Sequence, residues 1–231
     1  MSIATLILGE SGTGKTAALR NFDPSKVLLI QPVRKPLPFR SKDWKEIKAK
    51  GDNGNIFVCN DAAKIVEVMR RAPQEIIIID DWQYILSFKY MHSTGKKMAQ
   101  GEVFEFYKEL GNDGFKIAEM ATQLAPNKRI YVLAHTSTDD YGNVRIKTLG
   151  KLLDEKIVIE GLFTTVLRTK VNAGKYLFTT QNNGSDTVKS PMGMFDSNEI
   201  ENDLKAVDDT ICEYWDIGAT HEENAQNETE I

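Results

Sequence analysis

The stretch Ile7–Arg20, ILGESGTGKTAALR, decides the fold of this 231-residue chain. It contains the spacing Gly-x-x-x-x-Gly-Lys-Thr between an apolar, β-favouring run and a good helical start. A glycine-rich loop in that context turns successive backbone N–H groups toward phosphate oxygens. The sequence therefore predicts an α/β fold with a phosphate-binding loop. We expect these residues to hold a nucleotide: Gly9, Glu10, Ser11, Gly12, Thr13, Gly14, Lys15, Thr16 and Ala17.

Two side chains of this loop carry its chemistry. Lys15 is expected to reach the β- and γ-phosphates, and the hydroxyl of Thr16 is expected to bind Mg²⁺. The alternative is a glycine-rich turn with a coincidental lysine. The strand before the loop and the helix former Ala17 after it favour the phosphate loop.

A second stretch, EIIIIDDWQYI at Glu75–Ile85, is predicted to be a buried strand that ends in two acids. We assign Asp80, the first acid after the apolar run, to the magnesium ion, usually through water. Asp81 could polarise the attacking water or cap the helix that begins near Trp82, and the sequence leaves both roles open.

A third predicted strand begins RIYVLAH at Arg129 and ends in a polar cluster whose first member is His135. A polar residue at this strand tip could sense the γ-phosphate and pass its state to the following loop. An exposed histidine at a strand end is the equally weighted alternative.

The remaining pattern predicts a mainly parallel sheet covered by helices, because its apolar runs lack strict alternation. The runs are Ile3–Leu8, Val27–Ile30, Ile56–Val58, Ile76–Ile79 and Ile130–Ala134. Asp61 can cap one helix. A second is expected from Glu102 to Leu124, although Gly111 and Gly114 could split it.

The C-terminal part follows a different pattern. Leu162–Gln181 predicts two antiparallel strands joined by a turn around Asn172 to Gly174, which would extend the edge of the sheet. A final helix is predicted from an apolar stripe of Ile200, Leu204, Val207 and Ile211.

Charge and composition limit the function. The net charge is −4, and residues 217–231 contain four Glu but no Lys or Arg, so the rest of the chain is neutral and lacks a global basic field. We expect one domain over residues 1–216 and an acidic, disordered tail over 217–231. Two distant cysteines allow neither a disulfide framework nor a four-cysteine zinc site. No apolar run approaches a membrane span and no signal sequence is evident, so we expect a cytoplasmic protein without a membrane partner.

With these elements in order, the chain resembles the RecA-like branch of P-loop ATPases. It is most similar to short phage ATP-binding proteins that include the Sak-four single-strand annealing proteins, which are RecA/Rad-type cores without extra domains. The segments that carry the resemblance are GESGTGKT, KPLPFR, IIIIDDWQYI, TLGKLLDEKI, EGLFTTVL and TQNNGSDTVKSPMGMF. The resemblance implies a RecA-like ATPase core that uses ATP and Mg²⁺, forms a ring or filament, and anneals single-stranded DNA in phage recombination. A single-strand-binding protein is a further candidate partner.

The resemblance also implies two DNA-contacting loops, within 88–101 and 136–150. Their candidate contacts are Lys96, Lys97, Tyr141, Arg145 and Lys147. Cations among aromatic side chains suit single strands, because the backbone attracts charge and any base can stack. Without the resemblance, these loops would be interpreted as ordinary solvated loops. The basic segment Val33–Lys50, with Phe39 and Trp44, could bind DNA or pack against a neighbouring subunit.

One residue departs from the RecA-like pattern. Gln31 stands where such ATPases commonly carry a catalytic Glu, and Gln can orient a water but cannot accept its proton. Hydrolysis is then slow, depends on Asp81, or needs DNA and a neighbouring subunit. Lys189 is our candidate for a cation supplied by that neighbour, with Lys170 and Lys175 as alternatives. A nucleotide-gated loader or packaging subunit and a small-molecule kinase are the competing functions.

Overall fold

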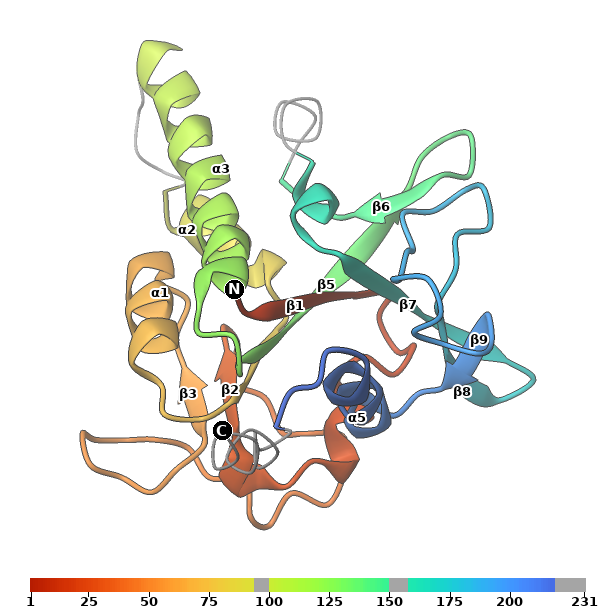
Figure 1. Cartoon of the computed structure of the whole chain (residues 1–231). Coiled ribbons are helices and arrows are strands. Elements are labelled where there is room, and N and C mark those ends of the chain that lie inside the picture. The colour runs from red at the N-terminus through yellow and green to blue at the C-terminus, as the bar shows by residue number, and fades with distance from the viewer. Residues whose placement is uncertain (94–99, 150–157, 219–231) are drawn as a thin grey trace, which may run out of the picture.

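The computed structural model describes residues 1–93, 100–149 and 158–218 and forms an α/β fold (Figure 1). Among these residues the main sheet runs in the order β3-β2-β4-β5-β1-β7-β8-β9, and β6 pairs with β5. The strands are β1 (Ile3–Gly9), β2 (Val27–Gln31), β3 (Ile56–Val58), β4 (Ile76–Asp80), β5 (Arg129–Thr138), β6 (Val144–Ile146), β7 (Thr165–Asn172), β8 (Lys175–Thr179) and β9 (Glu199–Glu201).

The six strands from β3 to β7 are all parallel to their neighbours, which confirms the predicted parallel sheet. Strand β5 lies between β1 and β4, with Gly9 opposite His135 and Asp80 opposite Leu133. Because the carboxyl ends of parallel strands meet at one edge, the three polar segments predicted from the sequence come together there.

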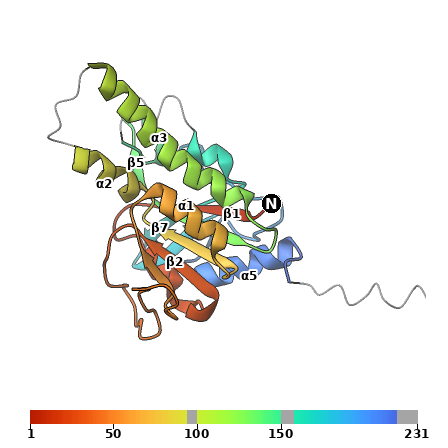
Figure 2. The ribbon, with the colours of Figure 1, turned by 90° about the vertical axis from the view of Figure 1, so that its left-hand side faces the viewer.

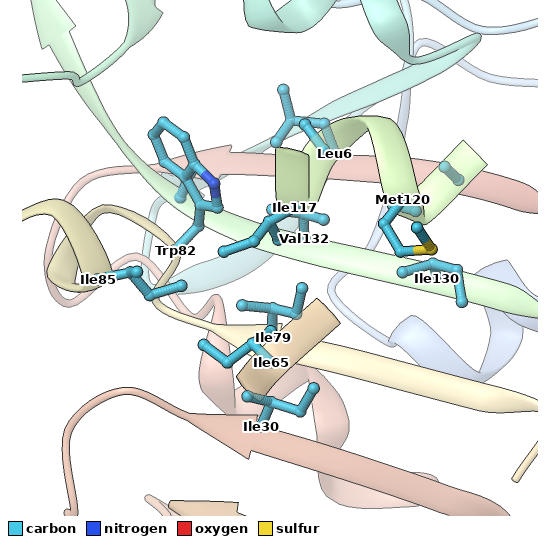
Figure 3. Packing of buried hydrophobic residues seen from close by; sticks show 14 of the residues in the cluster. Leu6, Ile30, Ile65, Ile79, Trp82, Ile85, Ile117, Met120, Ile130 and Val132 are labelled. Atoms are coloured by element: carbon cyan, nitrogen blue, oxygen red, sulfur yellow. The ribbon is translucent and has the colours of Figure 1, made fainter. Parts of the chain in front are cut away.

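Helices cover both faces of the sheet (Figures 1 and 2). One face packs against α1 (Ala62–Arg71), α2 (Gln83–Ser93) and α3 (Gln100–Gln123), and Figure 3 shows the core between them, including Ile65, Ile79, Ile117 and Val132. The other face packs against α5 (Leu204–Tyr214) and the 3₁₀ helix η1 (Thr16–Asn21). The side chain of Asp61 accepts the backbone N–H of Lys64, so the predicted cap of α1 is confirmed.

Helix α3 is continuous through both glycines, so the break considered from the sequence does not occur. The reason at Gly114 is packing. The indole N–H of Trp82 donates to the Gly114 carbonyl at 3.2 Å, and a Cβ on Gly114 would lie 2.6 Å from Trp82 Cζ2. The missing side chain therefore makes room for the largest fully buried residue of the core.

Gly114→Ala should destabilise the protein by about 1–3 kcal/mol, because the indole must move away from a well-packed position. The matched control is Gly101→Ala on the same helix, where a Cβ meets nothing within 4 Å. That control should leave stability unchanged or raise it by less than about 1 kcal/mol. Denaturant unfolding measures both, and equal effects of the two variants would contradict this packing account.

The C-terminal strands form the predicted antiparallel extension. Strand β7 runs parallel to β1 and then pairs antiparallel with β8, which pairs with β9. The β7–β8 turn places Ala173 and Gly174 at positive φ, as a tight hairpin turn requires. The prediction that Ile200 belongs to the apolar stripe of the last helix is wrong, because Ile200 lies in β9. Asp203, whose carboxylate accepts the N–H groups of Lys205 and Ala206, caps α5.

A buried ion pair ties α5 to the sheet. Arg129 contacts Asp208 at 3.0 Å, and the hydroxyl of Tyr131 donates to the same carboxylate at 2.6 Å.

The part of the chain that the structure describes contains no helix long and apolar enough to cross a membrane.

Candidate functional site

The phosphate loop connects β1 to η1 and depends on its glycines. Gly12 and Gly14 have φ values of 80° and 98°, a region that side chains with a Cβ rarely adopt. Gly9 has no such φ, but a Cβ there would lie 1.8 Å from Thr169 Oγ1 on β7. The predicted helical start is present as a six-residue 3₁₀ helix, held by the buried Ala18 and Leu19.

Lys15 folds back onto its own loop. Its buried ammonium donates to the carbonyls of Gly9 at 2.9 Å and Glu10 at 3.0 Å. Burial lowers the pKa of Lys15, and the nearby carboxylates of Asp81 and Asp80 oppose that shift. Among the residues that the structure describes, the acceptors of this ammonium are these two carbonyls, which phosphate oxygens can replace.

Thr16 and Asp80 form the group expected to hold magnesium. The Thr16 hydroxyl donates to the two carboxylate oxygens of Asp80 at 2.9 and 3.1 Å. Asp80 is fully buried, and burial, together with the Asp81 charge, raises the pKa of its carboxyl. A hydroxyl and a carboxylate are the oxygen ligands that Mg²⁺ prefers, and a buried carboxylate gains from a cation, so these residues fit the ion.

Asp81 faces the site instead of capping α2. Its Oδ2 accepts from Lys35 Nζ at 2.9 Å and lies 3.6 Å from His135 Nε2, whereas its Oδ1 is buried without a hydrogen-bond partner among the described residues. Burial opposes ionisation, but His135 and Lys35 hold the pKa of Asp81 at about 2. Asp81 is therefore an ionised carboxylate that lines the cavity and has one buried oxygen without a described partner. His135 is partly buried beside it rather than exposed at a strand end.

Lys35 is the functional candidate that the sequence reasoning missed. Its ammonium also lies 3.5 Å from Asp80, and these two acids raise the pKa of Lys35 against the effect of burial. Lys35 enters the site because Leu37 and Trp44, further along Val33–Lys50, are buried in the core of this chain. Trp44 is thus a core residue rather than a contact to DNA or to a neighbour. The sequence did contain a signal for Lys35, because this lysine closely follows β2, which ends at the edge of the sheet where the site lies.

Gln31 ends β2 one position beyond the pair Ile30 and Ile79, which places it beside Asp80 in the sheet. Its side chain is buried, and the amide nitrogen has no hydrogen-bond partner within the described residues. Gln31 does not line the main cavity.

A cavity of about 970 Å³ opens above the phosphate loop. It is lined on one side by Lys15, Thr16, Lys35, Asp81 and His135, and on the other by β8 and β9. Among the candidate cations from a neighbour, Lys175 lines this cavity, whereas Lys170 pairs with Glu199 at 2.5 Å. Lys189 is exposed, and its backbone pairs with that of Val166 on β7, outside the cavity. Lys189 therefore does not line the cavity of its own chain.

The candidate DNA contacts divide into two groups. Tyr141, Arg145 and Lys147 are all exposed on the hairpin formed by β5 and β6. Lys96 and Lys97 lie outside the described residues. The described hairpin is tied to the site, because the Lys147 N–H donates to the His135 carbonyl at 2.7 Å.

The fold and the site together define the class of the protein: an α/β P-loop fold with an acidic strand beside its phosphate loop. No family model and no curated protein matches the chain. Among solved structures it is similar to a prototypical ATPase from the type III secretion system of pathogenic bacteria, with 10% identity and a TM-score of 0.40 over 73% of this chain. The chain spans about half of that protein, 51%. It is also similar to a KaiC-like protein from Pyrococcus horikoshii OT3, with 12% identity, a TM-score of 0.39, and coverage of 79% of this chain and 81% of that one.

Proposed function

We propose that this chain binds ATP with Mg²⁺ at the phosphate loop and hydrolyses it. The observation that carries the proposal is that Lys15 and Thr16 line a cavity large enough for a nucleotide, while the buried Asp80 accepts the hydroxyl of Thr16. Glycines at positive φ leave the loop backbone free to approach phosphate oxygens. The oxygens of Thr16 and Asp80 supply the ligands for the metal.

Each polar side chain then has a role that its position supports. Magnesium bound by Thr16 and Asp80 would neutralise charge on the β- and γ-phosphates. Lys35, released from Asp80, can bind the γ-phosphate from within the same chain. The free Oδ1 of Asp81 can accept a hydrogen bond from the attacking water and orient it. His135 contacts Asp81 and is placed to respond when that contact changes.

Hydrolysis by this arrangement is expected to be slow in the isolated chain. A carboxyl with a pKa of about 2 is a weak base, and Gln31 cannot accept a proton. We therefore propose that residues 1–216 act as an ATPase unit that assembles into a ring or filament. In that assembly Lys189 of one copy would act on the nucleotide of the next, and 217–231 would remain a tail.

We further propose that the assembly binds single-stranded DNA through the β5–β6 hairpin and promotes annealing, as the family resemblance implies. Supporting this, Tyr141 is 91% exposed and shares the hairpin with Arg145 and Lys147. The hydrogen bond from Lys147 to the His135 carbonyl links this surface to the nucleotide site. Nucleotide state can therefore influence the position of the hairpin.

The double variant Arg145→Ala with Lys147→Ala should weaken binding of a single-stranded oligonucleotide about tenfold at low salt and leave ATP binding intact. Each lost phosphate contact lowers the slope of log affinity against log salt by about 0.7, so the slope should fall by about 1.4. Fluorescence anisotropy across a salt series measures both. Lys64→Ala with Arg70→Ala on α1 is the matched control. Equal losses in the two double variants would refute a hairpin site.

Phosphate release and nucleoside phosphorylation, measured with and without single-stranded DNA, separate the candidate functions. We expect Mg²⁺-dependent release of phosphate that DNA accelerates. Nucleotide that stays uncleaved in a single turnover would instead indicate a gate or loader. Phosphate transfer to a nucleoside would indicate a kinase.

A further inference from the structure

The outer wall of the cavity comes from the C-terminal extension rather than from the parallel core. Strand β8 contributes Tyr176 and Leu177, and Ile200 of β9 lines the same wall, which ends at Asn202 just beyond β9. None of these residues has a part in the phosphate chemistry proposed above. The wall therefore needs its own explanation.

Tyr176 and Asn202 lie side by side against the phosphate loop. Tyr176 directly precedes Leu177 and Asn202 directly follows Glu201, the end pair of the β8–β9 ladder, and the Asn202 N–H donates to the Tyr176 carbonyl at 3.2 Å. A Cβ on Gly14 would lie 2.9 Å from Tyr176 Cδ1 and 3.0 Å from Asn202 Oδ1. Both side chains thus pack directly on the loop that would hold the phosphates.

The side chain of Asn202 has unmet hydrogen-bonding capacity. The residue is 2% exposed, it lines the cavity, and neither its Nδ2 nor its Oδ1 has a hydrogen-bond partner among the described residues. A buried amide left without partners costs about 1–3 kcal/mol, and native proteins rarely leave one so. The Asn202 amide offers one donor and one acceptor side by side. It can therefore pair with a ligand edge that carries an acceptor next to a donor.

The other features of this wall favour a flat, uncharged group. Tyr176 is 49% exposed, so its ring can pack on a ligand, and Leu177 and Ile200 add apolar surface. Glu199 and Glu201 also line this side, but they pair with Lys170 and Arg20, and Lys175 lines the cavity too, so the charges of this wall largely balance. The loop N–H groups and the buried Lys15 ammonium favour phosphate at the other end, so a neutral part of the nucleotide belongs at the extension.

We propose that the extension is a base-binding subsite, in which Tyr176 stacks on the adenine of ATP and the Asn202 amide pairs with its edge. An Asn amide accepts from the 6-amino group of adenine and donates to the adjacent ring nitrogen, and an aromatic ring stacks on any base. This inference rests on the proposed binding of ATP at the phosphate loop. In this proposal the C-terminal extension selects which nucleotide binds.

The test is calorimetric binding of three ligands to the full chain with Mg²⁺: ATP, purine riboside triphosphate, which lacks the 6-amino group, and inorganic tripolyphosphate. The wild type should bind ATP roughly tenfold more tightly than purine riboside triphosphate, because one buried hydrogen bond is lost. Asn202→Ala removes both hydrogen bonds, so it should weaken ATP by more than tenfold, bind both nucleotides equally and leave tripolyphosphate unchanged. Asn127→Ala, an exposed amide remote from the cavity, is the control.

A second variant and a stability measurement make the result specific. Tyr176→Ala should weaken ATP binding about tenfold and Tyr176→Phe should not. The control is Tyr214→Ala, a partly exposed tyrosine at the end of α5 that does not line this cavity, and it should leave ATP binding unchanged. Without nucleotide, Asn202→Ala should melt at the same or a higher temperature, because it removes an unpaired buried amide.

The failures of the two proposals differ. A wild type that binds neither ATP nor tripolyphosphate would overturn the proposed function itself. Normal binding of tripolyphosphate with unchanged discrimination in Asn202→Ala would overturn the base subsite alone. So would a lowered melting temperature with equal losses for all three ligands, because Asn202 would then only support the loop.

Discussion

Lys15→Ala should abolish measurable ATP binding, lowering affinity by at least about 100-fold. The Lys15 ammonium is the buried cation inside the loop, and hydrogen bonds to charged groups contribute about 1.5–3 kcal/mol each, so two lost phosphate contacts account for this effect. The fold should survive. Burial lowers the pKa of Lys15, which shows that its charge is disfavoured there without a phosphate.

Calorimetry with ATP and Mg²⁺ measures the loss, and thermal unfolding without nucleotide checks the fold. Lys26→Ala, an exposed lysine near η1, is the matched control and should bind as the wild type does. Tight ATP binding by a folded Lys15→Ala protein would show that the phosphate loop is not the ATP-binding site.

Lys35→Ala should produce the second large effect, a loss of turnover of tenfold or more with a smaller change in ATP affinity. Lys35 contacts both carboxylates before ATP binds and lines the same cavity as Lys15. A cation that acts mainly on charge developing during transfer changes turnover more than binding. Steady-state kinetics separate the two, and Lys42→Ala, exposed in the same segment, is the control.

The same variant makes a prediction for stability against pH. Without nucleotide, Lys35→Ala should destabilise the protein by about 1–2 kcal/mol at pH 7, less than for a fully buried pair because Lys35 is 33% exposed. Lys35 lowers the pKa of Asp81, so its contribution is complete above the usual carboxyl value of 3.8 and is lost as pH falls toward about 2. The pKa of Asp80 is already raised, so Asp80 becomes protonated as pH falls. This removes the repulsion between Asp80 and Asp81 that destabilises the Lys35→Ala variant.

The stability difference between Lys35→Ala and the wild type should therefore shrink as pH falls from 7 toward about 2, most steeply below 3.8. Urea unfolding at several pH values measures it. A difference that is constant over this range would show that Lys35 contributes packing rather than charge.

The strands and the phosphate loop were predictable because their signals are local. Apolar runs place β1, β4 and β5 within a few residues of their observed bounds, and the loop spacing identifies Lys15 and Thr16. Asp80 could be assigned because it ends a buried strand that must reach the same edge as the loop.

Other features depend on long-range packing that one sequence does not display. Lys35 reaches Asp81 only because Leu37 and Trp44 are buried beneath its segment. Ile200 fits a helical stripe by spacing, yet pairing with Phe178 places it in a strand. Asn202 carries no motif at all, and its importance comes from lying on Gly14, far away in the chain.

The central claim is that Lys15, Thr16 and Asp80 form one site for ATP and magnesium. Its most direct test is the affinity of the wild-type chain for a non-hydrolysable ATP analogue, measured by calorimetry with and without Mg²⁺ and repeated with Asp80→Asn. The account predicts tight binding that magnesium strengthens about tenfold or more in the wild type and scarcely at all in Asp80→Asn. Binding that is absent, or that magnesium strengthens equally in both proteins, would contradict it.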